Sequence, residues 1–346
     1  MKALSKLRHA GLTLEDVARI ADVSPATVSR CLNRPETVNV KKRERVLAAV
    51  ERLGYVPHGA ARALASRQSR MVGVVFPSID NSLFGAALDA FQRTMADAGY
   101  TVIVASSAYD PELETQHIRR MLQSGIDALM LVGTERPDTT YRMIHARNIP
   151  YVTVWRTPGE SSHPSIGFDN VQAAKHLSNY LIGLGHRRIA FFSGHLEHND
   201  RARDRLEGVR QSHTQSGFTF DDSLILQRPF GVDGGRHMLR ACTALPSPPT
   251  AIICGAEPFA YGAIFEAAAL GIGVPAEISV AAFDDTWLAA QISPKLTTVR
   301  TPNLEIGEEA ARYLIARLAG ENAPPALPLD TELIIRESTA PPSQPR

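Results

Sequence analysis

The residues from Ser24 to Asn33 have side chains of the types that recognise nucleic acid. Arg30 can donate two hydrogen bonds to the edge of one guanine, and Ala26 can contact a thymine methyl group. Short hydroxyl and amide side chains, helped by the basic run 41–43, can bind phosphates. The predicted DNA-contacting residues of this segment and its neighbours are Thr13, Ser24, Pro25, Ala26, Thr27, Ser29, Arg30, Asn33 and Asn39.

Two short helices and a tight turn must present these side chains, and the sequence predicts them. Thr13 and Asp16 have the spacing of a capping box, and apolar residues follow at the spacing of one helical face. Ser24 is a good N-cap, and Pro25 suits the first helical position. A tight turn between two such helices is the helix-turn-helix pattern, whose second helix enters the DNA major groove. We expect helices at 14–21, 25–32 and 40–53, the last with Val46, Leu47, Val50 and Leu53 inward and ending at Gly54.

After residue 70, short apolar and β-branched runs alternate with segments of helical periodicity. Alternation of this kind predicts parallel sheets that are covered by helices on both faces. The length of the chain accommodates two such units. The predicted strands lie at 71–76, 101–106, 128–133, 151–155, 188–194, 251–256 and 278–284.

The loops that follow these strands are rich in aromatic, Asp and Arg residues. Ligands of open α/β sheets bind at the carboxyl ends of the strands, and two facing lobes would place those ends along one cleft. Aromatic rings can stack on the faces of a sugar, while carboxylates and guanidiniums bind its hydroxyls. The loops concerned are 77–84, 108–110, 155–156, 168–170, 195–205, 230, 256–257 and 284–287.

The distribution of charge favours a polyanionic partner at one end of the chain. The net charge is only +1, but residues 1–70 hold 14 Lys and Arg against 6 Asp and Glu, and the remainder holds 23 against 30. A basic end on an acidic body is typical of nucleic-acid binding by that end alone. The three cysteines have no CxxC spacing, and neither a secretory signal nor a membrane span is evident, so we expect a cytoplasmic protein without membrane contact.

Enzyme and metal motifs are missing from the sequence. The first strand-to-helix turn, FPSIDNSLFG, has no GxGxxG, and the chain contains no P-loop, GxSxG or HExxH motif. His195, His198 and Asp200 lie close together but in an expected surface loop, so we predict no metal site. We therefore expect no enzyme activity and no cofactor. A periplasmic-type binding receptor remains an alternative, although such a receptor would need a signal peptide and no basic head.

The stretches TLEDVARIADVSPATVSRCLN and RERVLAAVERLGYVPHGAARAL resemble the DNA-binding head of the lactose-repressor (LacI/GalR) family. The resemblance continues through VAAFDDTWLAAQISPKLTTVRTP to LIIREST. It implies an all-α helix-turn-helix DNA-binding head and an α/β periplasmic-binding-protein-like body of two doubly wound subdomains. The implied divisions are a head at 12–57, a hinge helix or linker at 58–69, a body at 70–340 with an N-subdomain (70–167 and 295–322) and a C-subdomain (168–293 and 324–340), and a tail at 341–346.

By motif position, the resemblance also implies a site for a small effector. Phe84 and Phe230 match aromatic residues that pack on the ligand, and Arg205 and Asp284 match effector-binding charges. Arg156 adds a second arginine in the expected cleft, which favours an acidic sugar derivative unless Arg156 pairs with Asp169 or another acid. The remaining expected cleft residues are Asp80, Trp155 and Glu257. The departure from the family at Ala256, where an asparagine is usual, removes one side-chain contact.

The function implied is that of a sequence-specific transcriptional regulator, a repressor, whose operator affinity is switched by a sugar or sugar acid. A regulator that responds to a nucleobase-type ligand is the second possibility. The hinge helix would fold on binding DNA, with Leu64 as a minor-groove wedge and Arg62 on phosphate. A homodimer, with Tyr261 and Ile292 in its interface, would bind a pseudo-palindromic double-stranded operator.

Overall fold

The structure is a computed structural model that describes residues 12–56, 68–79, 82–157, 163–324 and 328–343. The chain divides into two compact units, 1–69 and 70–346. We refer to the first as the head and to the second as the body, and each is described by itself.

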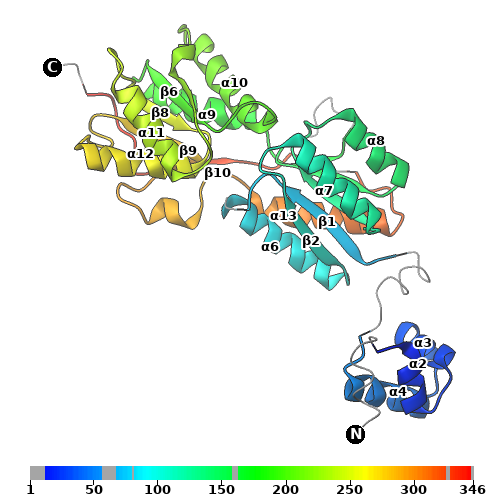
Figure 1. Ribbon diagram of the computed structural model, residues 1–346. Helices are drawn as coiled ribbons and strands as arrows, with labels where there is room; N and C mark the ends of the chain where they lie inside the picture. The colour runs from blue at the N-terminus through cyan, green and yellow to red at the C-terminus, as the bar shows by residue number, and fades with distance from the viewer. Residues whose placement is uncertain (1–11, 57–67, 80–81, 158–162, 325–327, 344–346) are drawn as a thin grey trace. The chain divides into compact units, whose positions relative to one another are not determined.

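The described residues of the head form three helices, α2 (Leu14–Ala21), α3 (Pro25–Asn33) and α4 (Val40–Leu53), with a short 3-10 turn η2 (Pro35–Thr37) before α4 (Figure 1). The predicted signals are confirmed, since Thr13 and Asp16 form a capping box, Ser24 caps α3 and Gly54 ends α4 in the left-handed conformation. The buried core includes Val17, Val28 and Val46 from the three helices. Leu47 was predicted to be inward, which is wrong, because its side chain is exposed on the outer face of α4.

Arg45 of α4 fixes the turn between α2 and α3. Its guanidinium donates to the carbonyl oxygens of Ala21 and Asp22 and pairs with the Asp22 carboxylate at 3.0 Å. Asp22 adopts the left-handed conformation that ends α2, and the carbonyls at this end have no partner within the helix. Arg45 therefore satisfies the polar groups at the point where the chain turns toward α3.

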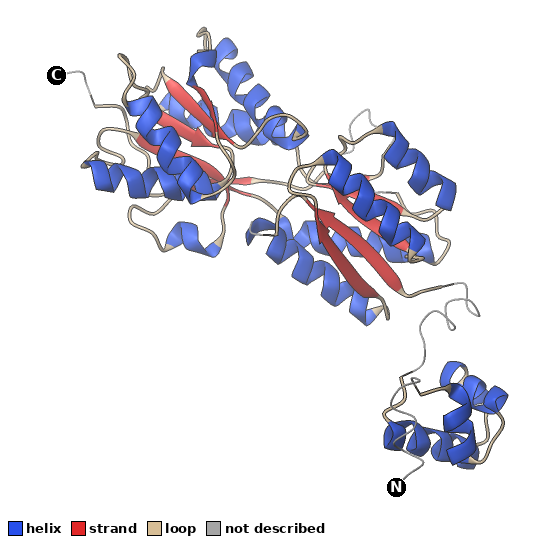
Figure 2. Ribbon diagram, in the orientation of Figure 1, coloured by secondary structure: helices blue, strands red, loops and turns tan. Residues whose placement is uncertain are grey.

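The first lobe of the body is a five-stranded parallel sheet in the order β2-β1-β3-β4-β5. The helices α6 and α13 pack together over one face of this sheet, and α7 and α8 lie over the other (Figures 1 and 2). The elements of the lobe are β1 (Met71–Phe76), α6 (Ser82–Asp97), β2 (Thr101–Ser106), α7 (Pro111–Gln123), β3 (Ala128–Val132), α8 (Asp138–Arg147), β4 (Tyr151–Val154), β5 (Ser165–Ile166) and α13 (Asn303–Leu318).

The second lobe is a six-stranded sheet in the order β11-β10-β9-β8-β6-β7. The sheet is parallel except at its edge strand β11, which pairs antiparallel with β10. The helices α9 and α10 pack as one pair, and α11 and α12 pack as another. The elements of the lobe are α9 (Asn170–Gly183), β6 (Ile189–Ser193), α10 (Asp200–Gln215), η3 (Asp222–Leu224), β7 (Ile225–Gln227), α11 (Val232–Thr243), β8 (Ala251–Cys254), α12 (Glu257–Leu270), β9 (Ser279–Asp284), η4 (Trp287–Ala290), β10 (Thr297–Arg300) and β11 (Glu332–Ile334).

The chain passes between the two lobes three times. The first passage follows β5, the second joins β10 to α13 at Thr301, and the third precedes β11. The predicted N-subdomain segment 295–322 is therefore wrong at its start, because β10 pairs with β9 in the sheet of the second lobe. The predicted fold class is confirmed, with a helical head and an α/β body whose sheets are mostly parallel.

Candidate DNA-binding surface and effector cleft

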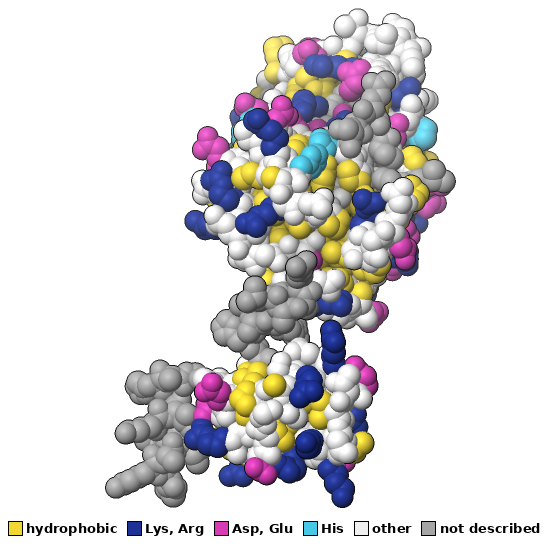
Figure 3. Space-filling model, turned by 90° about the vertical axis from the view of Figure 1, so that its right-hand side faces the viewer, with side chains coloured by type: hydrophobic (Ala, Val, Ile, Leu, Met, Phe, Trp, Pro, Cys, Tyr) yellow, Lys and Arg dark blue, Asp and Glu magenta, His cyan; other side chains and the backbone are white. Residues whose placement is uncertain are grey.

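Helix α3 presents an exposed polar face. Pro25, Ala26, Arg30 and Asn33 are exposed, whereas Val28 and Cys31 point into the core of the head. The Arg30 side chain lies along its own helix, with Nε 3.4 Å from the carbonyl oxygen of Ala26. Lys and Arg side chains are spread over the surface of the head in Figure 3. In the part of the head that the structure describes, this face of α3 is exposed and can therefore enter a DNA groove.

Three of the predicted phosphate-binding residues cap helices. Thr13, Ser24 and Asn39 accept backbone N–H groups at the first turns of α2, α3 and α4. Because the N-terminus of a helix carries partial positive charge, each cap lies where a phosphate is favoured. Their contact with DNA stays a prediction. Arg62 and Leu64 lie outside the described residues.

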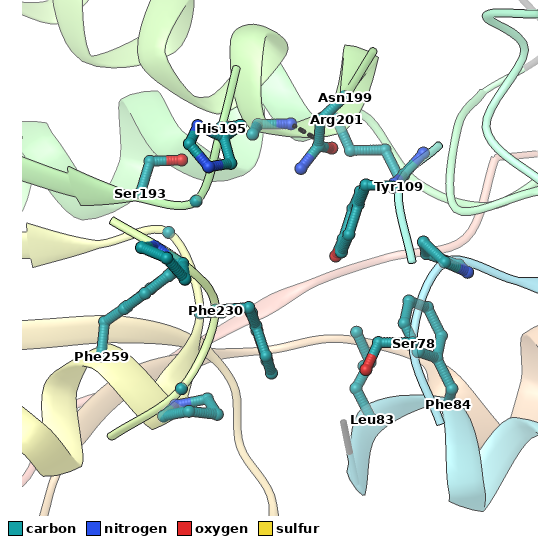
Figure 4. Close-up of a pocket in the computed structure, with 18 of the residues that line it drawn as sticks. Ser78, Leu83, Phe84, Tyr109, Ser193, His195, Asn199, Arg201, Phe230 and Phe259 are labelled. Carbon is teal, nitrogen blue, oxygen red and sulfur yellow. Dashed lines mark hydrogen bonds between the residues drawn. The ribbon is translucent and has the colours of Figure 1, made fainter. Parts of the chain in front are cut away.

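The body contains a cleft of about 680 Å³ lined by residues of both lobes. In Figure 4, Phe84, Leu83 and Tyr109 from the first lobe face Phe230, Ser193 and His195 from the second. The cleft lies at the carboxyl ends of the strands, as predicted. Its polar lining residues include Ser78, Tyr109, Ser193, His195, Asn199, Arg201, Arg205, Tyr261 and Asp284.

Aromatic rings form a wall of the cleft in each lobe. Phe84 stacks on Phe76 at a centroid distance of 5.0 Å and meets the edge of Trp155 at 4.9 Å. Phe230 packs edge to face on Phe259 at 5.6 Å. The predicted residues Phe84, Trp155 and Phe230 all line the cleft. A flat or ring-shaped ligand would therefore meet apolar surface on both sides.

Arg205 and Asp284 form the buried polar centre of the cleft. The Arg205 guanidinium donates to Asn170 Oδ1 at 2.9 Å and to the Gly255 carbonyl at 2.6 Å, and lies 3.8 Å from Asp284 Oδ1. Oδ1 of Asp284 is buried and has no hydrogen-bond partner among the described residues. Burial raises the pKa of Asp284 to about 6, against the opposing effect of Arg205. A ligand hydroxyl placed here can donate to Asp284 and accept from Arg205.

Four lining residues have a backbone conformation that side chains rarely adopt. The φ angles of Ala108, Tyr109, Trp155 and Asp284 are 51°, 62°, 64° and 117°. Each such conformation costs roughly 1–3 kcal/mol, and strained residues of this kind gather at ligand sites. Their presence on both sides of one cleft is the pattern of a binding site.

Arg156 does not line the cleft, and the expectation that it faces the ligand is wrong. Its Nε donates to Asp204 at 2.9 Å and its Nη1 to Thr134 Oγ1 at 2.7 Å, with Asp200 at 3.5 Å. The structure therefore agrees with the alternative expectation, in which Arg156 pairs with an acid instead of facing the ligand. The acid is not Asp169, which caps α9.

The second arginine of the cleft is Arg201, which the sequence reasoning missed. It lies four residues before Arg205, one helical turn away on α10. Tyr109 approaches it from the opposite lobe, and the contact with Arg201 opposes the rise that burial causes in the pKa of Tyr109. The spacing of Arg201 and Arg205 was a usable signal, since residues four apart share one face of a helix.

Glu257 and Tyr261 are placed differently from their predictions. Glu257 is buried behind the cleft, where its carboxylate accepts hydrogen bonds from the Tyr261 hydroxyl and from Thr286. Tyr261 was predicted at a dimer interface, which is wrong, because it is buried in the second lobe and lines the cleft. Ile292 is partly buried against the core under α12, and its place in an interface stays a prediction. Asp80 lies outside the described residues.

The buried carboxyl of Glu257 should make the stability of the body depend on pH. Burial and the nearby Asp284 raise the pKa of Glu257 to about 7. The folded state then holds a proton that the unfolded state releases near pH 4.5. The stability that this proton contributes is therefore fully present below pH 4.5 and is lost as pH rises through 7. We expect Glu257→Gln to be more stable than wild type by about 2–3 kcal/mol at pH 8, and by less than about 1 kcal/mol at pH 5.

Urea unfolding of both proteins at four pH values between 5 and 8 measures this difference. Glu207→Gln, which changes an exposed carboxyl on α10, is the matched control. A gap between Glu257→Gln and wild type that stays constant over this range would contradict the assignment.

A helix-turn-helix head joined to a two-lobed body with a buried polar cleft defines a class: the ligand-responsive transcription regulators. No helix of the described residues is long and apolar enough to cross a membrane. The described residues also contain no cluster of three or more His, Cys, Asp or Glu side chains that could hold a metal ion.

Comparison with known proteins assigns the chain within this class. Residues 13–58 match the lacI family of bacterial regulatory proteins, and residues 178–339 match the periplasmic binding protein-like domain. The HTH-type transcriptional repressor CytR of Escherichia coli strain K12 is 33% identical over 342 residues, which cover 98% of this chain and 99% of the relative.

Solved structures agree with the family models. A LacI-family regulator from Silicibacter pomeroyi has a TM-score of 0.85 and 28% identity, covering 94% of this chain and 99% of that one. The lac repressor dimer bound to operator and the anti-inducer ONPF has a TM-score of 0.81 and 26% identity, covering 95% and 99%. The protein belongs to the LacI family of transcription regulators and is a DNA-binding regulator of transcription.

Proposed function

We propose that the protein is a dimeric repressor whose affinity for a pseudo-palindromic operator is switched by a polyhydroxylated small molecule, a sugar or sugar acid, bound in the cleft. The observation that carries the proposal is the buried Arg205–Asp284 pair, which the second lobe presents to the cleft and whose Asp284 Oδ1 has no hydrogen-bond partner among the described residues. A ligand held by both lobes changes the balance between their relative positions, which is how binding in the cleft would reach the head.

The chemistry of the lining supports a polyol. Asp284 accepts and Arg205 donates, so one hydroxyl can satisfy both groups, and Ser78, Ser193 and Asn199 offer further neutral hydrogen bonds. The aromatic walls of Phe84 and Phe230 suit the apolar faces of a sugar ring. The solved cellobiose complex of the regulator CelR, which is 28% identical with a TM-score of 0.70, supports the same ligand class.

A nucleobase-type effector is the second candidate. Its support is the presence of an aromatic wall in each lobe, between which a planar base could stack. Under this alternative Asp284 and Arg205 would bind base or ribose groups. Neither candidate requires an enzymatic step.

A ligand screen distinguishes the candidates. The full-length protein is heated with a panel of neutral sugars, sugar acids and nucleosides, since a ligand that binds only the folded state raises the unfolding temperature. Compounds that raise it are then titrated by calorimetry and added to an operator-binding assay. We expect at least one polyol to bind and to change operator affinity. Binding by nucleosides alone would replace the first proposal with the second.

The head gives a prediction about DNA recognition that does not depend on the effector. Operator sequences selected from a random duplex pool should lose discrimination at one base pair per half-site in Arg30→Met, by about 1–3 kcal/mol. Lys42→Met, at the N-terminus of α4, should weaken binding of all sequences alike and lower the salt dependence. Equal loss for every sequence in Arg30→Met would show that Arg30 contacts only phosphate.

A further inference from the structure

We propose that Arg201 selects an effector that carries an anionic group, such as a carboxylate, and that Asp200 ties the binding of this group to contact between the two lobes. The inference rests on the proposed function, because it concerns the same cleft and names the acidic members of the ligand class.

Arg201 is a positioned cation at the wall of the cleft. Its Nη1 donates to Asp200 Oδ1 at 2.7 Å, and the side chain is 12% exposed. A guanidinium carries five N–H donors, and the partners found for Arg201 among the described residues are Asp200 and Tyr109. Donors therefore remain for a ligand, in the planar arrangement that matches a carboxylate.

The two cleft arginines have different tasks. Arg205 is committed to Asn170 and Gly255 and has Asp284 as its counter-ion, so it suits a neutral hydroxyl. Burial lowers the pKa of Arg205, and the carboxylate of Asp284 opposes this effect. The positive charge of Arg201 lowers the pKa of Arg205 further, by less than either of these two. An anion beside Arg201 would relieve this repulsion. One helical turn separates the two residues, about 5–6 Å between Cβ atoms, which matches the reach from the carboxylate of a sugar acid to its hydroxyls.

Asp200 connects Arg201 to the opposite lobe. While Asp200 Oδ1 accepts from Arg201, Oδ2 accepts from the backbone N–H of Thr134 at 2.7 Å, from Thr134 Oγ1 at 3.1 Å and from the N–H of Glu135 at 3.3 Å. Thr134 and Glu135 follow β3 in the first lobe, and Asp200 begins α10 in the second. One carboxylate thus holds the cation of the cleft with one oxygen and the facing lobe with the other.

The surroundings of Asp200 show that this contact is tightly fitted. Burial alone would raise the pKa of Asp200, but Arg201, the Thr134 N–H and Arg156 together hold it below its usual value. Gly133 lies against the pair so closely that an added Cβ would come within 2.2 Å of Arg201 Nη1. An anion that shares Arg201 changes the charge balance at Asp200, and so changes the strength of the contact between the lobes.

The test compares four variants of the full-length protein. Arg201→Met removes the cation, and Asp200→Asn weakens the link between the lobes. Arg210→Met and Asp222→Asn are matched controls, because Arg210 of α10 pairs with Asp222 at 2.9 Å and neither residue lines the cleft. Calorimetry uses gluconate, glucuronate and galacturonate, each beside glucose or galactose as its neutral counterpart.

We expect wild type and both controls to bind at least one acid about 10- to 100-fold more tightly than its neutral counterpart. Arg201→Met should bind acid and neutral sugar within about 3-fold of each other. Asp200→Asn should lose less acid affinity than Arg201→Met, while the change in operator affinity caused by the acid shrinks to under about 2-fold.

Four outcomes overturn the inference. If wild type binds neutral sugars and no acid, the proposed function stands and the selection by Arg201 fails. If Arg201→Met keeps the preference for the acid, another residue recognises the anion. If Asp200→Asn keeps the full operator response, the link through Asp200 is wrong. Failure of every compound to bind wild type would remove the proposed ligand class together with this inference.

Discussion

Arg205→Met is expected to abolish the response to the effector and to destabilise the body. The variant loses the charged donor of the cleft, which should lower effector affinity at least 100-fold, or about 3 kcal/mol. It also leaves the buried Asp284 without its counter-ion, and removal of one member of a buried ion pair costs about 3–5 kcal/mol. Calorimetry with a ligand from the screen and urea unfolding measure the two effects separately.

The loss of stability in Arg205→Met should grow with pH. Without the guanidinium, the pKa of the buried Asp284 rises above its present value of about 6, so the folded variant holds a proton that the unfolded chain releases. Stability is then lost as pH rises through that pKa. The double variant Arg205→Met/Asp284→Asn should recover most of the stability and none of the binding. Normal effector affinity in Arg205→Met would show that the ligand binds elsewhere.

Gly307→Ala is expected to destabilise the body by about 3 kcal/mol through a steric clash in the helical layer. Gly307 of α13 lies where this helix crosses α6, and an added Cβ would sit 2.1 Å from the carbonyl oxygen of Ala87. The atom it meets is backbone, so the helices must move apart, and overpacking of this kind typically costs about 1–3 kcal/mol or more. Thermal unfolding should occur roughly 5–10 °C lower.

The matched control is Gly183→Ala at the end of α9. This glycine is exposed and an added Cβ would have no atom within 4 Å. Alanine is the better helix former, so the control should leave stability unchanged or raise it by about 0.5 kcal/mol. Equal effects at Gly307 and Gly183 would mean that α6 and α13 are less tightly packed than the structure indicates.

Local signals predicted the elements that depend on local interactions. The capping box at Thr13, the N-cap at Ser24 and the strands 71–76 and 101–106 were found from sequence at their observed bounds. The strands that were missed, β5, β7, β10 and β11, have two to four residues each and mostly lie toward the edges of the sheets. Runs this short carry little periodicity, and their pairing depends on neighbours that are distant in sequence.

The sequence identified the charged residues at the centre of the cleft but not all of the residues around them. Arg205 and Asp284 were identified from motif position, but sequence could not show which other arginine would reach the cleft. Arg156 and Arg201 both follow strand ends, and the difference is that two acids of α10 hold Arg156 outside the cleft. The inward direction of Tyr261 is likewise set by its hydrogen bond to the buried Glu257, a contact that no local pattern encodes.

The three passages of the chain between the lobes have a consequence for protein engineering. The head meets the body at one junction, Ser69 to Arg70, so a chimaera that exchanges heads between relatives needs a single splice. A chimaera that exchanges one lobe needs three, because β10 belongs to one lobe while α13, which follows it directly, belongs to the other. Changing the operator specificity by recombination should therefore be far easier than transplanting half of the effector cleft.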